Sequence, residues 1–85
     1  MMWYQTGPYF AYYYMGRYQD VINLATQTID YTEKPYLEES FYWRGRAEAA
    51  IGKVSDDISD QRTAIKYHPG FQPALDELTR LGVGN

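Results

Sequence analysis

The chain of 85 residues contains no cysteine and only one histidine, His68. It can therefore form neither a disulfide framework nor a thiolate metal site, and a single histidine cannot build a multi-histidine metal centre. We expect no metal and no cofactor. No apolar run approaches the roughly 20 residues that cross a bilayer, so we expect no contact with a membrane. Eight basic residues face 11 acidic ones, and the formal net charge of −3 argues against nucleic acid as a partner.

The motifs of common active sites are also missing. Gly16 and Gly52 are isolated glycines and not parts of a glycine-rich phosphate loop. The acidic clusters at residues 38–39 and 56–60 stand where helices should begin, a position that the helix dipole makes favourable for acids. His68 suits a helix end, where its side chain can interact with the last carbonyl groups. The sequence predicts a protein that is not an enzyme.

Aromatic residues are abundant instead: ten tyrosines, two tryptophans and three phenylalanines. A tyrosine ring packs well, while its hydroxyl group needs a hydrogen-bond partner, so tyrosine suits half-buried surfaces. Two interpretations stay open for these residues. They fill the space between helices, or several of them line a contact surface, where tyrosine and tryptophan are enriched.

The sequence repeats itself at an offset of 36 residues. The identical pairs are Ala11 and Ala47, Gly16 and Gly52, Asp20 and Asp56, Ile22 and Ile58, Ile29 and Ile65, and Tyr31 and Tyr67. A period of this length is typical of stacked helical repeats, in which one repeat cannot bury its apolar face alone.

Apolar spacing and breaker residues predict about five helices, over residues 8–15, 18–31, 36–51, 56–67 and 73–81. Gly16 and Gly52 end the first and third helices, and Pro35 breaks the chain before the third. Ser55 is the expected N-cap of the fourth helix. Short connections predict antiparallel neighbours, and no strand pattern is present.

These residues resemble a tetratricopeptide repeat. The second unit, residues 38–71, fits the 34-residue pattern, with the characteristic positions held by Phe41, Gly45, Gly52, Ala64 and Pro69. The first unit, about residues 2–35, fits less well, because Thr28 replaces a small residue. Residues 71–81 are similar to the helix that caps such arrays. The resemblance implies one all-α domain, a short right-handed solenoid of antiparallel helix–turn–helix repeats.

Two residues depart from the family pattern. Asp57 stands where the family usually has alanine, and Gln61 where it has a large apolar residue. Burying either group without a partner costs about 1–3 kcal/mol. Arg44, Arg46 or a tyrosine hydroxyl group could satisfy them locally, the second helix of the unit could be rotated, or both groups could face solvent.

The resemblance also implies a function, because the first helices of such repeats line a concave groove that binds peptides or proteins. The groove positions in this chain are Phe10, Tyr13, Tyr14, Glu39, Tyr42, Trp43, Arg46 and Arg80. Such a groove could hold an apolar or aromatic peptide and bind one of its carboxylates through Arg46. We therefore expect a non-catalytic scaffold module whose partner is a protein or a peptide.

A structural role is the alternative. The first residues, including Trp3 and Tyr4, are apolar and have no polar cap before them, so this end should stack on another surface. A homodimer would close it, as would an upstream part of a larger multidomain protein. The compartment stays open, although the absence of cysteine favours the cytoplasm.

Overall fold

The computed structural model describes residues 7–31 and 37–83, and these residues form five helices and no strand. The helices are α1 (Gly7–Tyr14), α2 (Tyr18–Tyr31), α3 (Leu37–Ala50), α4 (Val54–Tyr67) and α5 (Gln72–Arg80). The prediction of an all-α chain is confirmed for these residues.

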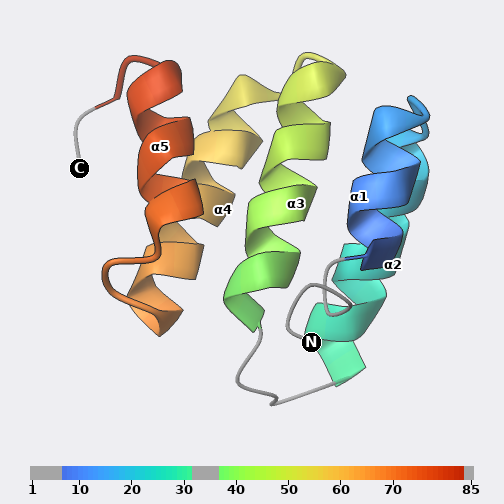
Figure 1. Cartoon of the computed structure of the whole chain (residues 1–85), viewed down its shortest axis with the longest axis horizontal. Helices are drawn as coiled ribbons and strands as arrows, with labels where there is room; N and C mark the ends of the chain where they lie inside the picture. The colour runs from blue at the N-terminus through green and yellow to red at the C-terminus, as the bar shows by residue number, and fades with distance from the viewer. Residues whose placement is uncertain (1–6, 32–36, 84–85) are drawn as a thin grey trace.

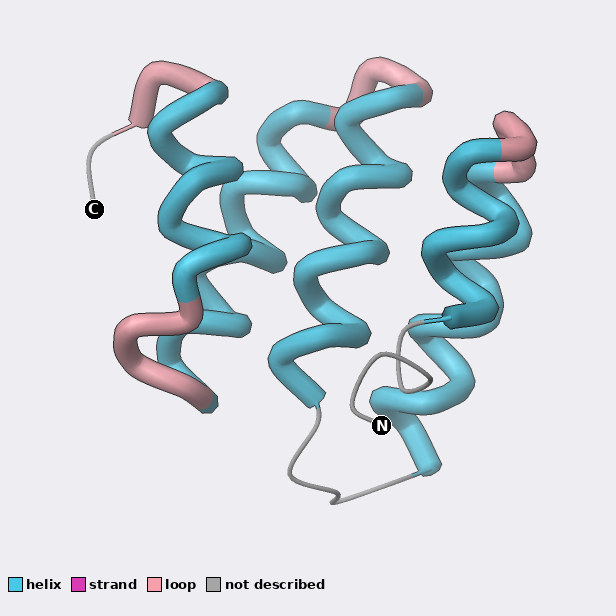
Figure 2. The backbone as a smooth tube through the Cα atoms, in the orientation of Figure 1, coloured by secondary structure: helices cyan, strands magenta, loops and turns pink. Residues whose placement is uncertain are grey.

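The helices lie in two layers. Figure 1 shows α1, α3 and α5 side by side, with α2 and α4 behind them. Helix α2 contacts α1 and α3, and α4 contacts α3 and α5, so each rear helix bridges two front ones. Short turns connect α1 to α2, α3 to α4 and α4 to α5 (Figure 2). Consecutive helices joined in this way run antiparallel.

Each front helix ends in the same glycine cap. Gly16, Gly52 and Gly82 adopt positive φ angles of 78°, 91° and 79°. Each glycine N–H donates to the carbonyl group three residues earlier at 3.0 Å, and the next N–H donates to the carbonyl group five residues before it. This pattern is the Schellman motif, which needs a left-handed residue and therefore favours glycine.

The helix boundaries repeat the 36-residue period of the sequence. Helix α4 begins and ends 36 residues after α2, and α3 ends 36 residues after α1. The predicted bounds of α2 are confirmed. Helices α1 and α5 each begin and end one residue before the predicted bounds, and α3 ends one residue before its predicted end.

One boundary prediction was wrong. Helix α4 begins at Val54, so Ser55 lies inside the helix and is not its N-cap. Lys53 occupies the N-cap position and makes no side-chain capping hydrogen bond. The glycine cap at Gly52 and the start of α4 share this tight turn, and the backbone re-enters the helical conformation before it reaches Ser55.

The core consists of two apolar clusters. The first joins α1, α2 and α3 and contains Tyr9, Val21, Ala25, Trp43 and Ala47. The second joins α3, α4 and the start of α5 and contains Phe41, Ala64, Phe71 and Ala74. Tyr42 packs against both clusters from the front layer. Full burial of one large apolar side chain contributes about 1.5–3 kcal/mol, so these clusters hold the two layers together.

Candidate functional site

All of the predicted groove residues belong to the front layer. Helix α1 contributes Phe10, Tyr13 and Tyr14, α3 contributes Glu39, Tyr42, Trp43 and Arg46, and α5 contributes Arg80. Trp3 and Tyr4, the predicted self-association residues, lie outside the described residues.

Aromatic rings connect α1 to α3 across this layer. The ring centre of Trp43 lies 5.5 Å from that of Tyr13, 6.1 Å from that of Phe10 and 5.1 Å from that of Tyr42. These pairs meet edge to face, the geometry that the ring quadrupoles favour. Trp43 is only 8% exposed, so it forms the base of the array and not its accessible surface.

The accessible aromatic surface comes from α1. Phe10 is 55% exposed and Tyr14 is 62% exposed, and their ring centres lie 4.8 Å apart. Together they form an exposed apolar surface on α1. Large exposed aromatic side chains of this kind are typical of contact surfaces.

Arg46 lies among three of these rings. Its guanidinium carbon is 4.6 Å from the ring centre of Tyr13, 5.6 Å from that of Trp43 and 5.9 Å from that of Tyr42. It also donates to the hydroxyl groups of Tyr13 and Tyr42, both at 3.3 Å. Its Nε atom is buried without a hydrogen-bond partner. The cation is thus held in place by ring faces, and its donors are only weakly used.

A depression of about 390 Å³ lies between α3 and α5 beside Arg46. Its lining residues are Tyr42, Arg46, Pro73, Asp76, Glu77 and Arg80. Three predicted groove residues therefore meet here: Tyr42, Arg46 and Arg80. Phe10, Tyr14 and Glu39 do not line the depression, and half-buried Glu39 has a raised pKa because of burial and the nearby Glu38.

Glu77 is the central residue of this site that the sequence interpretation missed. It is 5% exposed, and both of its oxygens accept hydrogen bonds from Arg80, at 2.9 and 2.6 Å. The Nε atom of Arg46 lies 4.0 Å from its Oε1. Burial acts to raise the pKa of Glu77, but the hydrogen bonds from Arg80 and the nearby charges outweigh it, and the pKa is lowered. Glu77 stays ionised between two arginines.

Asp57 and Gln61 on α4 are both completely buried, which excludes the alternative that they face solvent. Gln61 Nε2 donates to Asp57 Oδ1 at 2.8 Å and to the backbone carbonyl of Tyr42 at 3.0 Å. Local satisfaction is therefore only partial, because neither Asp57 Oδ2 nor Gln61 Oε1 accepts a hydrogen bond from the residues that the structure describes.

Gly45 makes room for these two side chains. A Cβ atom at Gly45 would lie 2.5 Å from Asp57 Oδ1 and 2.5 Å from Gln61 Nε2. The residues 36 positions earlier are Tyr9, Val21 and Ala25, which form the first apolar cluster. The first unit thus combines a large aromatic residue with two smaller apolar ones. The second unit combines glycine with two polar residues in the same positions, and Gln61 is larger than its equivalent, Ala25.

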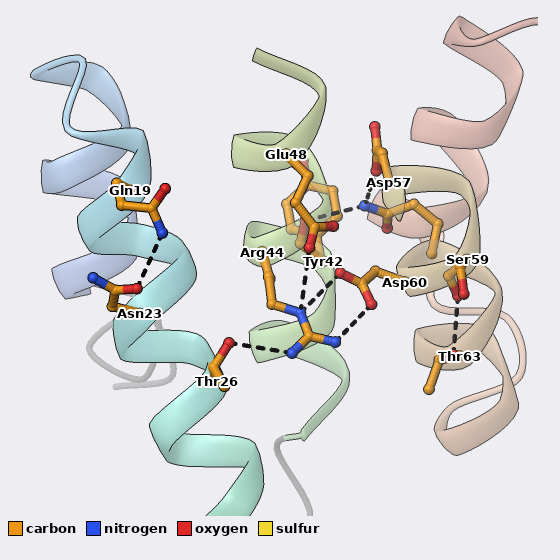
Figure 3. A network of polar contacts seen from close by, with 11 residues as sticks. Gln19, Asn23, Thr26, Tyr42, Arg44, Glu48, Asp57, Ser59, Asp60 and Thr63 are labelled. Atoms are coloured by element: carbon orange, nitrogen blue, oxygen red, sulfur yellow. Dashed lines mark hydrogen bonds and ion pairs between the residues drawn. The ribbon is translucent and has the colours of Figure 1, made fainter. Parts of the chain in front are cut away.

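A second polar network lies between α2, α3 and α4, shown in Figure 3. Arg44 donates to both oxygens of Asp60, at 2.9 and 2.8 Å, and to Thr26 at 3.3 Å. Its Nε atom is 3.8 Å from Glu48. Arg44 therefore satisfies Asp60 and not Asp57 or Gln61. Burial, followed by the neighbouring Asp60 carboxyl group, raises the pKa of Glu48 to about 8.

Two further observations concern ligands. Within residues 7–31 and 37–83, no three histidine, cysteine or acidic side chains are placed to hold a metal ion. None of the helices in this part of the chain is long and apolar enough to span a bilayer.

No protein-family model matches the chain, and neither a curated protein nor a solved structure is detectably similar to it.

Proposed function

We propose that the chain is a short tetratricopeptide-like solenoid, right-handed, whose front layer binds a protein or a peptide without catalysing a reaction. The recurrence of helix boundaries and glycine caps supports the repeat fold, because each unit reproduces the same helix–turn–helix geometry. In this arrangement α1, α3 and α5 are the first helices of successive units. Their shared face is the concave surface that such repeats use for binding.

The observation that carries the proposal is the depression beside Arg46. Tyr42, Arg46 and Arg80 line it, and the exposed rings of Phe10 and Tyr14 extend the same face along α1. Tyrosine, tryptophan and arginine are the residues most enriched at the energetic centres of protein interfaces. Rings that are already ordered by mutual packing lose little conformational entropy when a ligand binds.

The chemistry of this face indicates the kind of peptide that fits it. An apolar or aromatic side chain of the peptide would pack on Phe10 and Tyr14. A carboxylate would accept hydrogen bonds from Arg46 and Arg80, whose charges only partly cancel against Glu77. The Glu77 carboxylate serves as the partner of Arg46 and Arg80 in this proposal and not as a catalytic group.

The test is a binding measurement with peptides selected from a random library on the immobilised chain. We expect Arg80→Gln and Tyr14→Ala each to weaken the selected peptide at least fivefold in fluorescence anisotropy, because both side chains are exposed on the front layer. Arg62→Gln is the matched control, since Arg62 is exposed on α4 in the rear layer. Equal affinity of all four proteins would contradict the proposal.

Self-association is a second candidate, and one observation favours it. Ala11 is exposed on α1, whereas Ala47, its equivalent in the second unit, is completely buried against α2. Helix α1 carries no charged side chain, and Met15 just beyond it is 66% exposed. A two-fold contact through α1 would bring no like charges together. Light scattering over a concentration series tests it, and a mass that stays monomeric excludes it.

A further inference from the structure

Three helices meet around one buried carboxyl group, that of Asp57 on α4. Asp57 is 0% exposed, and its Oδ1 accepts the hydrogen bond from Gln61. Its Oδ2 is buried and accepts no hydrogen bond from any of the described residues. An ionised carboxylate can only accept hydrogen bonds, whereas a protonated one can also donate. A proton on Oδ2 would therefore let Asp57 donate a hydrogen bond, which the ionised form cannot do.

The groups that face Asp57 come from α3 and α5. Helix α5 supplies Glu77 and Arg80, and α3 brings Arg46 to Glu77, with 4.0 Å between Arg46 Nε and Glu77 Oε1. On α4 itself, Asp60 is bound to Arg44 and Asp56 is exposed. On α5, exposed Asp76 accepts a hydrogen bond from Gln72 at 2.7 Å. Among these side chains, the carboxylate of Glu77 is the one that acts on Asp57 and can accept a hydrogen bond from its proton.

These surroundings shift the pKa values of the Asp57 and Glu77 carboxyl groups in opposite directions. Burial raises the pKa of Asp57 to about 7, and the neighbouring Glu77 carboxyl group adds to this rise. The pKa of Glu77 is lowered, as described above. The proton therefore stays on Asp57, and Glu77 remains the charged partner of Arg80 and Arg46.

We propose that the proton shared by Asp57 and Glu77 keeps α5 docked on α3 and α4, and that its loss to solvent loosens α5. This inference deepens the proposed function and rests on it, because its effect on ligand binding requires that the depression is the binding site. Helix α5 carries Pro73, Asp76, Glu77 and Arg80, four of the residues that line the depression. Loosening α5 therefore dismantles the depression, and protonation of Asp57 restores it.

The expected size follows from proton linkage. When α5 is undocked, Asp57 returns to its ordinary pKa of 3.8, so the docked form binds the proton more tightly. Docking is then fully supported at low pH and weakens as the pH rises towards 7 and above. Between pH 6 and pH 8 the equilibrium constant for undocking should increase about tenfold.

Hydrogen exchange of the α5 amides measures this equilibrium directly, once corrected for the pH dependence of the intrinsic rates. In the unmodified protein we expect the protection factors of α5 to fall about tenfold from pH 6 to pH 8. Asp57→Asn should keep the pH 6 value at pH 8, because its amide group donates as the protonated carboxyl does. Asp56→Asn removes the same charge from an exposed neighbour, so it should retain the tenfold fall.

An equal tenfold fall in Asp57→Asn would overturn the inference, as would constant protection in the unmodified protein. Should Asp57→Asn not fold, carbon-13 titration of the Asp57 carboxyl in the unmodified protein decides instead. A midpoint near pH 7 supports the proton, and a midpoint below pH 5 overturns it. Neither measurement uses a peptide, so failure here leaves the binding proposal standing, and failure of peptide binding leaves the docking result standing.

Discussion

At the scale of single residues, the polar layer of the second unit depends on one missing side chain. Gly45 leaves the space into which Asp57 and Gln61 fit, and the repeat pattern marks its position as small. The equivalent place in the first unit holds Tyr9, whose hydroxyl group instead pairs with Ser40 at 2.8 Å. Apolar side chains fill this space in the first unit, and the polar side chains of Asp57 and Gln61 fill it in the second. Polar packing thus replaces apolar packing in the second unit.

Gly45→Ala should therefore destabilise the protein, although alanine is the better helix former by about 1 kcal/mol. The new methyl group would overlap Asp57 and Gln61, and overpacking of this kind costs about 1–3 kcal/mol. Urea unfolding should show a net loss of up to about 2 kcal/mol. In an Asp57→Ala background the same substitution should cost less, because one of the two overlaps is gone. A gain in stability from Gly45→Ala alone would show that the space is not filled.

Glu48 leads to a prediction about pH. Its Oε1 atom is buried without a partner, and its pKa is raised to about 8 from an ordinary value of 4.5. The stability that it contributes is present below pH 4.5 and is lost as the pH rises towards 8. Between pH 6 and pH 9 we expect the free energy of unfolding to fall by about 1–3 kcal/mol on this account.

Glu48→Gln should flatten this dependence, because glutamine resembles the protonated acid in shape and hydrogen bonding. Thermal unfolding at pH 6 and pH 9 compares the two proteins, with Asp76→Asn as a control for the removal of an exposed charge. Identical pH profiles for Glu48→Gln and the unmodified protein would contradict the assignment.

At the scale of helices, the sequence was most informative where a glycine ends the helix. Gly16 and Gly52 were predicted as helix ends and adopt positive φ angles, because only the left-handed conformation closes these caps. The start of α4 was harder to predict. A serine followed by two aspartates resembles an N-cap sequence, but the Gly52 turn leads the backbone into the helix one residue before Ser55. The geometry of the turn therefore determines where α4 begins, and the preference of serine for the N-cap position does not.

Gly52 provides the corresponding test. A Cβ atom there would meet no other atom within 4 Å, so only its φ of 91° opposes substitution. We expect Gly52→Ala to lower the free energy of unfolding by about 1–2 kcal/mol, the cost of a left-handed L-residue. Gly52→Asn should lose less, because asparagine tolerates this conformation better. Equal unfolding midpoints for glycine and alanine would rule out the cap as a source of stability.

At the scale of the whole molecule, part of the candidate site was predictable and part was not. The repeat pattern indicated which face of α1, α3 and α5 would be shared, and it placed Tyr42, Arg46 and Arg80 there. It could not indicate Glu77, because the approach of Arg46 to Glu77 joins α3 to α5, which are not consecutive helices. The pairing of Arg44 with Asp60 instead of Asp57 depends equally on how α3 and α4 face each other.

The front layer and α2 expose different kinds of side chain, a difference that fits the proposed function. The front layer exposes Phe10 and Tyr14 and holds Arg46 among ring faces, whereas the exposed face of α2 carries polar residues such as Gln19 and Asn23. A ligand that binds through apolar and carboxylate groups should therefore distinguish the two faces. We propose that the depression between α3 and α5 determines where such a ligand binds on the front layer.

Amide chemical-shift mapping with a library-selected peptide tests the central claim most directly. We predict that the largest shifts fall on Phe10, Tyr14, Tyr42, Arg46 and Arg80, which belong to α1, α3 and α5 of the front layer. Shifts concentrated on the exposed residues of α2 and α4 would place the binding surface on the opposite layer and contradict the account.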